Sequence, residues 1–221
     1  MLRLDNICYR YKKSERDTLK GISAEFQAGK FTSIVGPSGS GKTTLLSIMA
    51  GLDTPSSGIV EIDGKNLAEL DLDHYRRKQI AMIFQAFQLF PLLTTLENVC
   101  YPMDMNKVPK EKAKSRAKEL LISVGIDEEK HKRYPSNLSG GEQQRVAIAR
   151  ALSTGAKVIL ADEPTGNLDE TNGDIVVAIL KNLAHNEGYA VVVVTHNLEI
   201  AEASDVVYRM SDGAVNRLGY R

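Results

Sequence analysis

Apolar and polar residues alternate through much of the first thirty positions of the chain. The apolar positions are Leu2, Leu4, Ile7, Tyr9 and Tyr11, followed after a gap by Leu19, Ile22 and Phe26. Alternation of this kind is typical of strands with one buried face, and the charged segment 12–17 is typical of the turn that joins two of them. The pattern predicts an antiparallel β layer, and a further short strand is expected over 59–62.

Two later runs, 158–161 and 190–194, are apolar at every position, and a third apolar run covers 80–84. Continuous runs are typical of parallel strands that are covered on both faces of a sheet. Helical spacing of apolar residues marks 43–50 and 110–124, and another helix is expected over about 173–186. The predicted fold class is therefore α/β, with a mostly parallel sheet and the antiparallel β layer at its N-terminal side.

The middle of the chain, 87–135, is predicted to form a helical lobe. A length of 221 residues suits one large domain with such an insertion. We therefore expect a single domain over 1–221, with the core and the β layer in 1–86 and 136–221. The glycine-rich stretch 138–143 is assigned to the lobe as well.

Composition narrows the classes of partner. Lysine plus arginine equals aspartate plus glutamate, at 28 each, so the chain has no net basic field that would attract nucleic acid. No nucleic-acid partner is therefore expected. Cys8 and Cys100 are not spaced for zinc or for a disulfide framework, which fits a reducing cytosol. No signal peptide, no membrane span and no regulatory domain after Gly213 are expected, so the chain is predicted to be soluble by itself.

A glycine-rich loop joins the expected strand 31–35 to the helix that follows. Loop and helix start comprise Gly36, Pro37, Ser38, Gly39, Ser40, Gly41, Lys42, Thr43 and Thr44. Glycines let backbone N–H groups turn inward around an oligophosphate, Lys42 reaches the terminal phosphates, and the Thr43 hydroxyl is suited to hold Mg²⁺. The helix N-terminus points its free N–H groups at the same anion. This order of elements predicts a nucleoside triphosphate site rather than an ordinary glycine turn.

Acidic and polar residues follow the buried runs. Asp162 and Glu163 come directly after 158–161. Since ligands bind beyond the carboxyl ends of parallel strands, both residues are expected near the phosphate loop. Asp162 is placed to accept a hydrogen bond from Mg²⁺-bound water. Glu163 is placed to orient or deprotonate the water that attacks the phosphate. The alternative for such a pair is a solvated turn.

Two further residues end buried strands. Thr195 and His196 follow the run 190–194, where a histidine donor reaches a terminal phosphate. Gln85 ends the strand before the lobe, and its neutral amide can touch metal or water and move with the lobe. His196 is therefore a predicted catalytic residue, and Gln85 a predicted catalytic and metal-site residue.

A second glycine-containing stretch lies about a hundred residues after the first. It consists of Leu138, Ser139, Gly140, Gly141, Glu142 and Gln143. Ser139 followed at the third position by Glu142, ahead of an apolar run, is a capping box that opens a helix. A plain helix cap is one reading. Bare glycines in the cap also let the helix N-terminus approach an anion, and since this chain has one nucleotide loop, we predict that the anion is a partner chain's nucleotide.

With these motifs in order, essentially the whole chain resembles the ATP-binding cassette (ABC) ATPases. The resemblance implies ATP and Mg²⁺ as ligands and a P-loop NTPase core. It makes Tyr11 the aromatic that stacks on adenine, the loop from Gly36 the Walker A motif and Gln85 the Q-loop glutamine. It implies that Asp162 ends Walker B, that Glu163 is the catalytic glutamate and that His196 is the switch histidine. The residues implied for the D-loop are Asn167, Leu168 and Asp169, and those implied for the signature are 138–143.

The resemblance extends to a subfamily. Segments 84–99 and 164–169 resemble the ATPases of lipoprotein-release, macrolide-efflux and bacitracin-type peptide-resistance systems. The resemblance to this subfamily implies a homodimer on the cytoplasmic face of the plasma membrane, attached to an integral permease with a large extracytoplasmic domain. It also implies roles such as antimicrobial peptide resistance. The short polar segment 103–108 departs from relatives that carry a longer apolar stretch there, which leaves the contact with the permease open.

Two other classes of protein share some of these motifs. A soluble cassette ATPase of DNA repair or chromosome maintenance is disfavoured by the balanced charge and the absence of sustained heptads. A small-molecule kinase leaves the stretch 138–143 unexplained.

The ABC transporter interpretation adds one more expectation. Part of an apolar segment is expected to line a groove for a cytoplasmic helix of the permease; the segment contains Phe87, Leu89, Phe90, Leu92 and Leu93. The alternative is that the segment belongs to the core of the lobe.

Overall fold

The larger of two sheets has six strands in the computed structural model, which describes residues 1–12 and 14–218. Across this sheet the order is β10 (Ala214–Leu218), β9 (Val206–Ser211), β3 (Phe31–Val35), β8 (Ala190–Thr195), β7 (Val158–Asp162) and β6 (Ile80–Ile83). Strands β9, β3, β8, β7 and β6 run parallel, and β10 pairs antiparallel with β9. The predicted α/β class with a mostly parallel sheet is confirmed.

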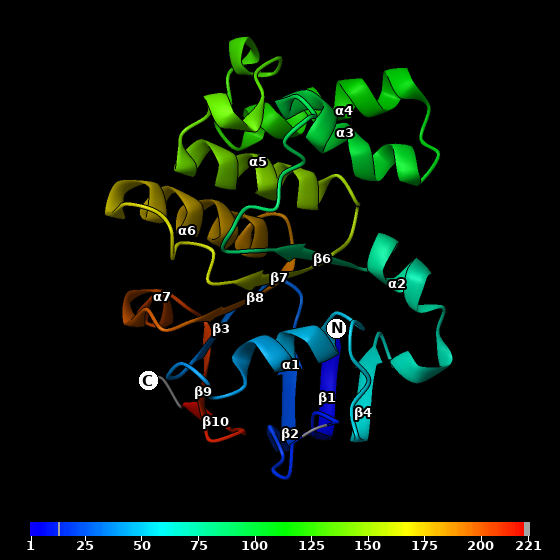
Figure 1. Cartoon of the computed structure of the whole chain (residues 1–221), viewed down its shortest axis with the longest axis vertical. Coiled ribbons are helices and arrows are strands. Elements are labelled where there is room, and N and C mark those ends of the chain that lie inside the picture. Colours follow the sequence, from blue (N-terminus) through cyan, green and yellow to red (C-terminus); the bar gives the residue numbers. More distant parts are fainter. Residues whose placement is uncertain (13, 219–221) are drawn as a thin grey trace.

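A smaller antiparallel sheet lies on one side of the molecule (Figure 1). Its order is β2 (Leu19–Phe26), β1 (Leu2–Tyr9), β4 (Ser57–Ile62) and β5 (Lys65–Asn66). The predicted β layer is therefore confirmed, and β4 begins two residues before the expected strand. The turn expected over 12–17 includes Lys13, which is outside the described residues.

One apolar core fills the space between the two sheets. Helix α1 (Lys42–Met49) lies in this space, with Leu45, Leu46 and Ile48 fully buried (Figure 1). The inward residues of β1 and β2 pack on it from one side, and the inward residues of β8 pack on it from the other. Because α1 is held between two sheets, the phosphate loop that precedes it has a rigid base.

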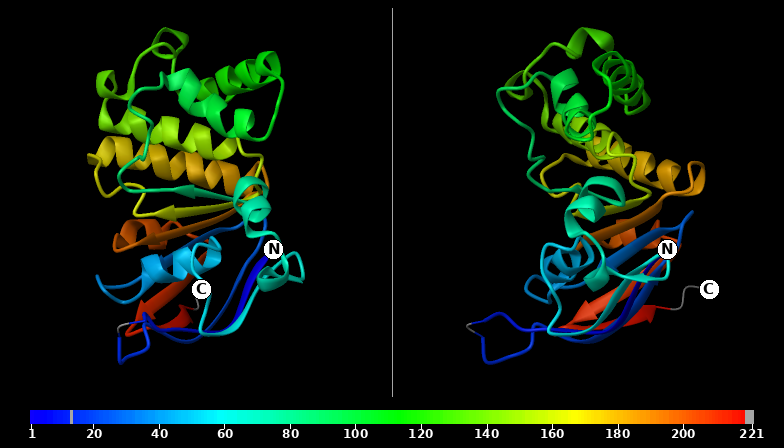
Figure 2. Two further views of the ribbon diagram at one scale, coloured as in Figure 1. Left: turned by 45° about the vertical axis from the view of Figure 1, so that its right-hand side comes forward. Right: turned by 90° about the vertical axis from the view of Figure 1, so that its right-hand side faces the viewer.

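The opposite face of the larger sheet carries the remaining long helices. Helix α6 (Glu170–His185) covers the sheet, α5 (Gly140–Leu152) packs on α6, and α3 (Thr95–Met105) and α4 (Lys110–Ser123) pack on α5. Figures 1 and 2 show α3 and α4 at the end of the molecule farthest from the antiparallel sheet. The shorter elements are α2 (Leu72–Lys78), α7 (Leu198–Glu202) and the 3-10 helices Leu67–Glu69, Glu128–Lys130 and Pro135–Asn137.

The helix boundaries test the expectations taken from periodicity. Helix α4 ends one residue before the predicted limit, and Gly125 follows in the left-handed region, at φ 76°, as a C-terminal glycine does. The start expected for the helix at 173 is wrong by three residues, since α6 begins at Glu170. The reason is a side-chain cap, because Asp169 accepts a hydrogen bond from the Asn172 N–H at 2.8 Å.

No helix in the described ranges 1–12 and 14–218 is long and apolar enough to cross a membrane. The carboxyl ends of the parallel strands meet at one edge of the larger sheet, and β3, β7 and β8 are neighbours there. The loops that leave these strands therefore converge, as expected for a ligand site in a sheet of this kind.

Candidate active site

The phosphate loop leaves β3 and enters α1 with glycines that the local geometry requires. A Cβ atom on Gly36 would lie 2.2 Å from the Met210 carbonyl oxygen, and Gly41 adopts φ 106°. The Lys42 ammonium donates to the carbonyls of Gly36 and Pro37, at 2.9 and 3.0 Å. The Ser40 hydroxyl is buried with no partner among the described residues. This loop thus has both a cation and a free hydroxyl directed at its own interior.

A cavity of about 760 Å³ opens beside this loop. Its lining combines residues from the β layer, the phosphate loop, the end of β6, the end of β7 and the end of β8. The lining residues are Tyr11, Thr18, Ser38, Gly39, Gly41, Lys42, Thr43, Thr44, Gln85, Asp162, Glu163 and His196. Most residues predicted from the sequence to bind nucleotide or to act in catalysis therefore share one cavity.

Thr43 and Asp162 form the part of the cavity that fits Mg²⁺. Thr43 Oγ1 donates to Asp162 Oδ1 at 3.5 Å. Burial raises the pKa of the Asp162 carboxyl, and the nearby charge of Glu163 raises it further. No group of three or more His, Cys, Asp or Glu side chains in the described part of the chain could hold a metal. One hydroxyl and one carboxylate suit Mg²⁺, which keeps water and phosphate oxygens as its other ligands.

Glu163 is held at both carboxylate oxygens. Thr195 Oγ1 donates to Oε2 at 3.0 Å, and His196 Nδ1 lies 2.9 Å from Oε1. Glu163 also adopts φ 46°, a left-handed conformation that costs energy for a residue with a side chain. Thr195 is 1% exposed. The sequence placed Thr195 beside the site without giving it a role, and its position directly before His196 was the signal available.

Gln85 and Asn167 bind each other through two hydrogen bonds. Gln85 Nε2 donates to Asn167 Oδ1 at 3.2 Å, and Asn167 Nδ2 donates to the Gln85 carbonyl at 2.9 Å. These residues are 82 positions apart in the sequence. The segments predicted as Q-loop and D-loop are thus joined at the edge of the cavity.

Tyr11 presents an open aromatic ring at the other end of the cavity. Its side chain is 47% exposed, its hydroxyl lies 2.9 Å from Thr44 Oγ1, and the Tyr9 ring packs edge-on at 5.0 Å between centroids. A base can stack on such a ring because the ring is fixed on one side and free on the other. The geometry fits the predicted contact with adenine.

The stretch 138–143 lies outside this cavity. Ser139 caps α5, and the predicted capping box with Glu142 is present in both directions, at 2.8 and 3.3 Å. A Cβ atom on Gly141 would lie 2.0 Å from Asn172 Oδ1, so packing against α6 already requires this glycine. Gly140 has only ordinary contacts at 3.7 Å and beyond. The bare backbone expected for anion binding is therefore available at Gly140 but is used for packing at Gly141.

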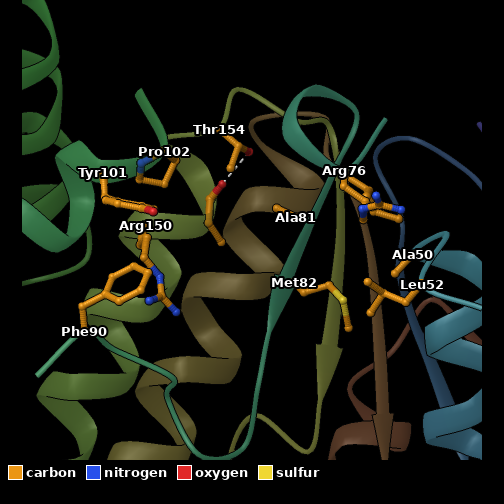
Figure 3. Close-up of a pocket in the computed structure, with 12 residues that line it drawn as sticks. Ala50, Leu52, Arg76, Ala81, Met82, Phe90, Tyr101, Pro102, Arg150 and Thr154 are labelled. Carbon is orange, nitrogen blue, oxygen red and sulfur yellow. Dashed lines mark hydrogen bonds between the residues drawn. The ribbon is translucent and has the colours of Figure 1, made fainter. Parts of the chain in front are cut away.

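A second, mostly apolar cavity of about 290 Å³ lies between β6, α2, α3 and α5 (Figure 3). We call it the β6 groove, and it is lined by Ala50, Leu52, Arg76, Ile80, Ala81, Met82, Phe90, Tyr101, Pro102, Arg150, Ala151 and Thr154. Of the five apolar residues singled out in 87–93, only Phe90 lines it. Leu89 packs on the core that contains α5, and Leu92 is 86% exposed. Phe90 therefore lines a groove, and a permease helix in that groove stays a prediction, whereas Leu89 follows the alternative of lobe core.

Comparison with known proteins agrees with this geometry. The family model described as ABC transporter matches residues 19–166. YclH of Bacillus subtilis, an uncharacterized ABC transporter ATP-binding protein, is 40% identical and covers 97% of this chain and 95% of its own length. MJ0796 of Methanocaldococcus jannaschii, described in the same words, is 42% identical over 98% of this chain and 96% of its own length.

Solved structures extend the comparison. The dimeric structure of MJ0796 has a TM-score of 0.89 at 41% identity, with 100% of both chains covered. MJ0796 has also been solved as a dimer in a post-hydrolysis state with ADP and Pi. CbiO1 of Clostridium perfringens, part of the cbiONQ transporter complex, has a TM-score of 0.89 at 30% identity, covering 97% of this chain and 86% of its own. The chain belongs to the ABC transporter family, as an ATP-binding subunit with the ATPase fold and activity of that family.

Proposed function

We propose that the protein hydrolyses ATP as a nucleotide-sandwiched homodimer that drives a separate membrane permease. The observation that carries this proposal is that the predicted site residues lie in two separate places on one chain. The cavity holds the phosphate loop, Asp162, Glu163 and His196, whereas Ser139 opens α5 outside it. In a two-fold dimer, each Ser139 can complete the cavity of the other copy. The dimeric structures of the relative MJ0796 support this arrangement.

The predicted site residues have distinct tasks in phosphoryl transfer. Lys42 exchanges its two loop carbonyls for the terminal phosphates of ATP, and Tyr11 stacks on the adenine ring. Thr43, Asp162 and Gln85 would hold Mg²⁺, which when bound would neutralise phosphate charge. Glu163 orients or deprotonates the attacking water, and His196 both holds Glu163 and donates to the terminal phosphate. Asn167 keeps Gln85 in place from the D-loop side.

The permease partner is proposed from the family and from the β6 groove. We assign the membrane-spanning part of the transporter to a separate permease chain; none of the described helices is long and apolar enough to cross a bilayer. The relative cbiO1 is part of a transporter complex. We assign the β6 groove to a short cytoplasmic helix of the permease, which would pack apolar residues on Met82, Phe90 and Tyr101. Such attachment places the protein at the cytoplasmic face of the plasma membrane.

The direction and the cargo follow the subfamily resemblance. We propose an exporter or mechanotransmission system for peptide, antibiotic or lipoprotein, with a permease that carries a large extracytoplasmic domain. Movement is proposed between the core (1–86 and 136–221) and the lobe (87–135), and the signature stretch 138–143 at the start of α5, assigned to the lobe as well, would move with it. The lobe helices α3 and α4 contact α5 extensively, and Gln85 lies where the chain enters the lobe. ATP binding would close the dimer, and hydrolysis would release it.

Co-expression tests this proposal. The chain is produced together with the membrane protein encoded beside its gene, and a tag on the chain is used for purification in mild detergent. We expect a stable complex with two copies of this chain, and ATPase activity that changes when the permease is present. A neighbouring gene product that does not bind, or that binds without two copies of this chain, would contradict the proposal.

A further inference from the structure

Gln144 occupies an unusual place on helix α5. Its side chain is 0% exposed, and its amide nitrogen donates to two backbone carbonyls from other segments. Nε2 lies 2.8 Å from the Pro164 carbonyl oxygen and 3.4 Å from that of Phe84. Its amide oxygen, Oε1, is buried with no partner among the described residues. A buried amide that leaves one of its own atoms unpaired is uncommon and calls for a reason.

The two carbonyls have one property in common. Phe84 is the residue before Gln85, and Pro164 is the residue after Glu163. A single amide group therefore fixes the backbone next to both of the residues placed around the reacting phosphate. Glu163 needs such support, because its left-handed conformation persists only where the surroundings hold it.

Helix α5 holds the Q-loop at a second point, at Arg150, six residues after Gln144. Arg150 Nη1 donates to the Gln88 carbonyl at 2.6 Å, and Nη2 donates to the Phe87 carbonyl at 3.1 Å. Figure 3 shows the Arg150 guanidinium beside the Phe90 ring in the β6 groove. Gln85 thus lies between two attachments to α5, and Ser139 is the N-cap of the helix that carries them.

We propose that Gln144 is a positioning residue for ATP hydrolysis, which aligns Glu163 and Gln85 through one amide. The inference rests on the proposed roles of these two residues. Gln144 does not touch the nucleotide. It fixes the separation of the two segments and ties both to the signature helix, so that the catalytic glutamate and the Q-loop glutamine keep one geometry when α5 moves.

The role requires a donor and not merely a side chain of the right volume. Methionine has a similar length and would fill the space, but it would leave the Phe84 and Pro164 carbonyls without the amide donor. A carboxylic acid at the same place donates only when protonated. Gln144→Met and Gln144→Glu therefore separate packing from hydrogen bonding.

Turnover and binding are to be measured for both variants in the full-length protein. We expect Gln144→Met to bind ATP with a Kd within about threefold of wild type but to lose roughly 10–100-fold in kcat, because a small misplacement of the catalytic groups affects only the chemical step. Gln144→Glu should be most active at the lowest pH tested and fall, relative to wild type, as the pH rises and the carboxyl loses its proton. A purely structural role would not produce this pH profile.

Asn98→Leu is the matched control. Asn98 is also a fully buried amide, and it donates to the carbonyls of Phe90, Leu93 and Thr94 in the lobe. This variant should lower the melting temperature while its kcat per folded molecule stays near wild type. Equal losses of kcat in the Asn98 and Gln144 variants would overturn the inference.

Glu163→Gln, measured in parallel, separates this inference from the proposed function. If Glu163→Gln still hydrolyses ATP, the catalytic role proposed for Glu163 fails. If it is inactive while Gln144→Met turns over like wild type, only the inference about Gln144 fails. Should Gln144→Met not fold, the pH profile of Gln144→Glu decides, and a constant ratio to wild type across pH would overturn the inference.

Discussion

His196 Nδ1 lies 2.9 Å from Glu163 Oε1, so the proposed base and the proposed switch histidine form one hydrogen-bonded pair at the ends of two adjacent strands. Thr195 binds the other oxygen of the same carboxylate. Glu163 is therefore fixed in direction before any water is activated. Preorganisation of this kind favours catalysis because the base need not be reoriented at the moment of reaction.

The first prediction concerns the charge on Glu163. Glu163→Gln keeps the length of the side chain but removes the base, so ATP should still bind while hydrolysis falls by at least about 100-fold. The variant should then accumulate as a dimer in ATP and Mg²⁺, measured by size-exclusion chromatography with light scattering. Glu202→Gln, an exposed substitution on α7, serves as the control and should behave as wild type. A Glu163→Gln monomer in saturating ATP would contradict the prediction.

The second prediction concerns pH and Asp162. Burial raises the pKa of this carboxyl, so the folded protein holds the proton more tightly than the unfolded chain does. Stability should therefore decrease as the pH rises from the unfolded pKa, about 4, through the raised folded value, and remain lower at pH 7.

Asp162→Asn removes this effect. Without nucleotide or Mg²⁺, the variant should melt a few degrees above wild type at pH 7, and the difference should disappear below about pH 4. ATP with Mg²⁺ should stabilise wild type much more than the variant, since Asp162 belongs to the proposed metal site. Thermal melts across a pH series measure both effects, and a variant that melts below wild type at pH 7 would refute the assignment.

The sequence predicts those parts of the fold and site that are determined by residues close together in the chain. The phosphate loop, the ends of β7 and β8 and the capping box at Ser139 are set by neighbouring residues, and all were located correctly. Helix α2 was not predicted because Tyr75 is its only buried residue, which leaves no periodic signal. Strands β9 and β10 were missed as well.

The missed parts of the site depend on contacts between distant segments. Gln144 and Phe84 are 60 positions apart, and Arg150 and Phe87 are 63 apart. Nothing in the local sequence distinguishes these side chains from other polar residues on a helix. The need for glycine at Gly141 likewise arises from Asn172, which belongs to the next long helix and becomes a neighbour only in the folded chain.

The third prediction tests the β6 groove. Phe90→Glu places a charge on the groove lining, so the permease should dissociate while ATP binding and the melting temperature of the isolated subunit change little. Leu92→Glu is the matched control, because Leu92 is 86% exposed and does not line the groove. Pull-down of the co-expressed permease measures the difference. Unfolding of Phe90→Glu, or equal loss of the permease in both variants, would place the contact elsewhere.

The central claim is that each active site is shared between two copies of the chain, and mixing two inactive variants tests it most directly. Lys42→Ala removes the charge that meets the terminal phosphates, and Ser139→Arg blocks the partner's site with bulk and charge. Each homodimer should be inactive. In a heterodimer, isolated with two different tags, one site carries both defects and the other carries neither. We predict that ATPase activity returns in the isolated heterodimer, whereas verified heterodimers with no activity above either parent would contradict the shared site.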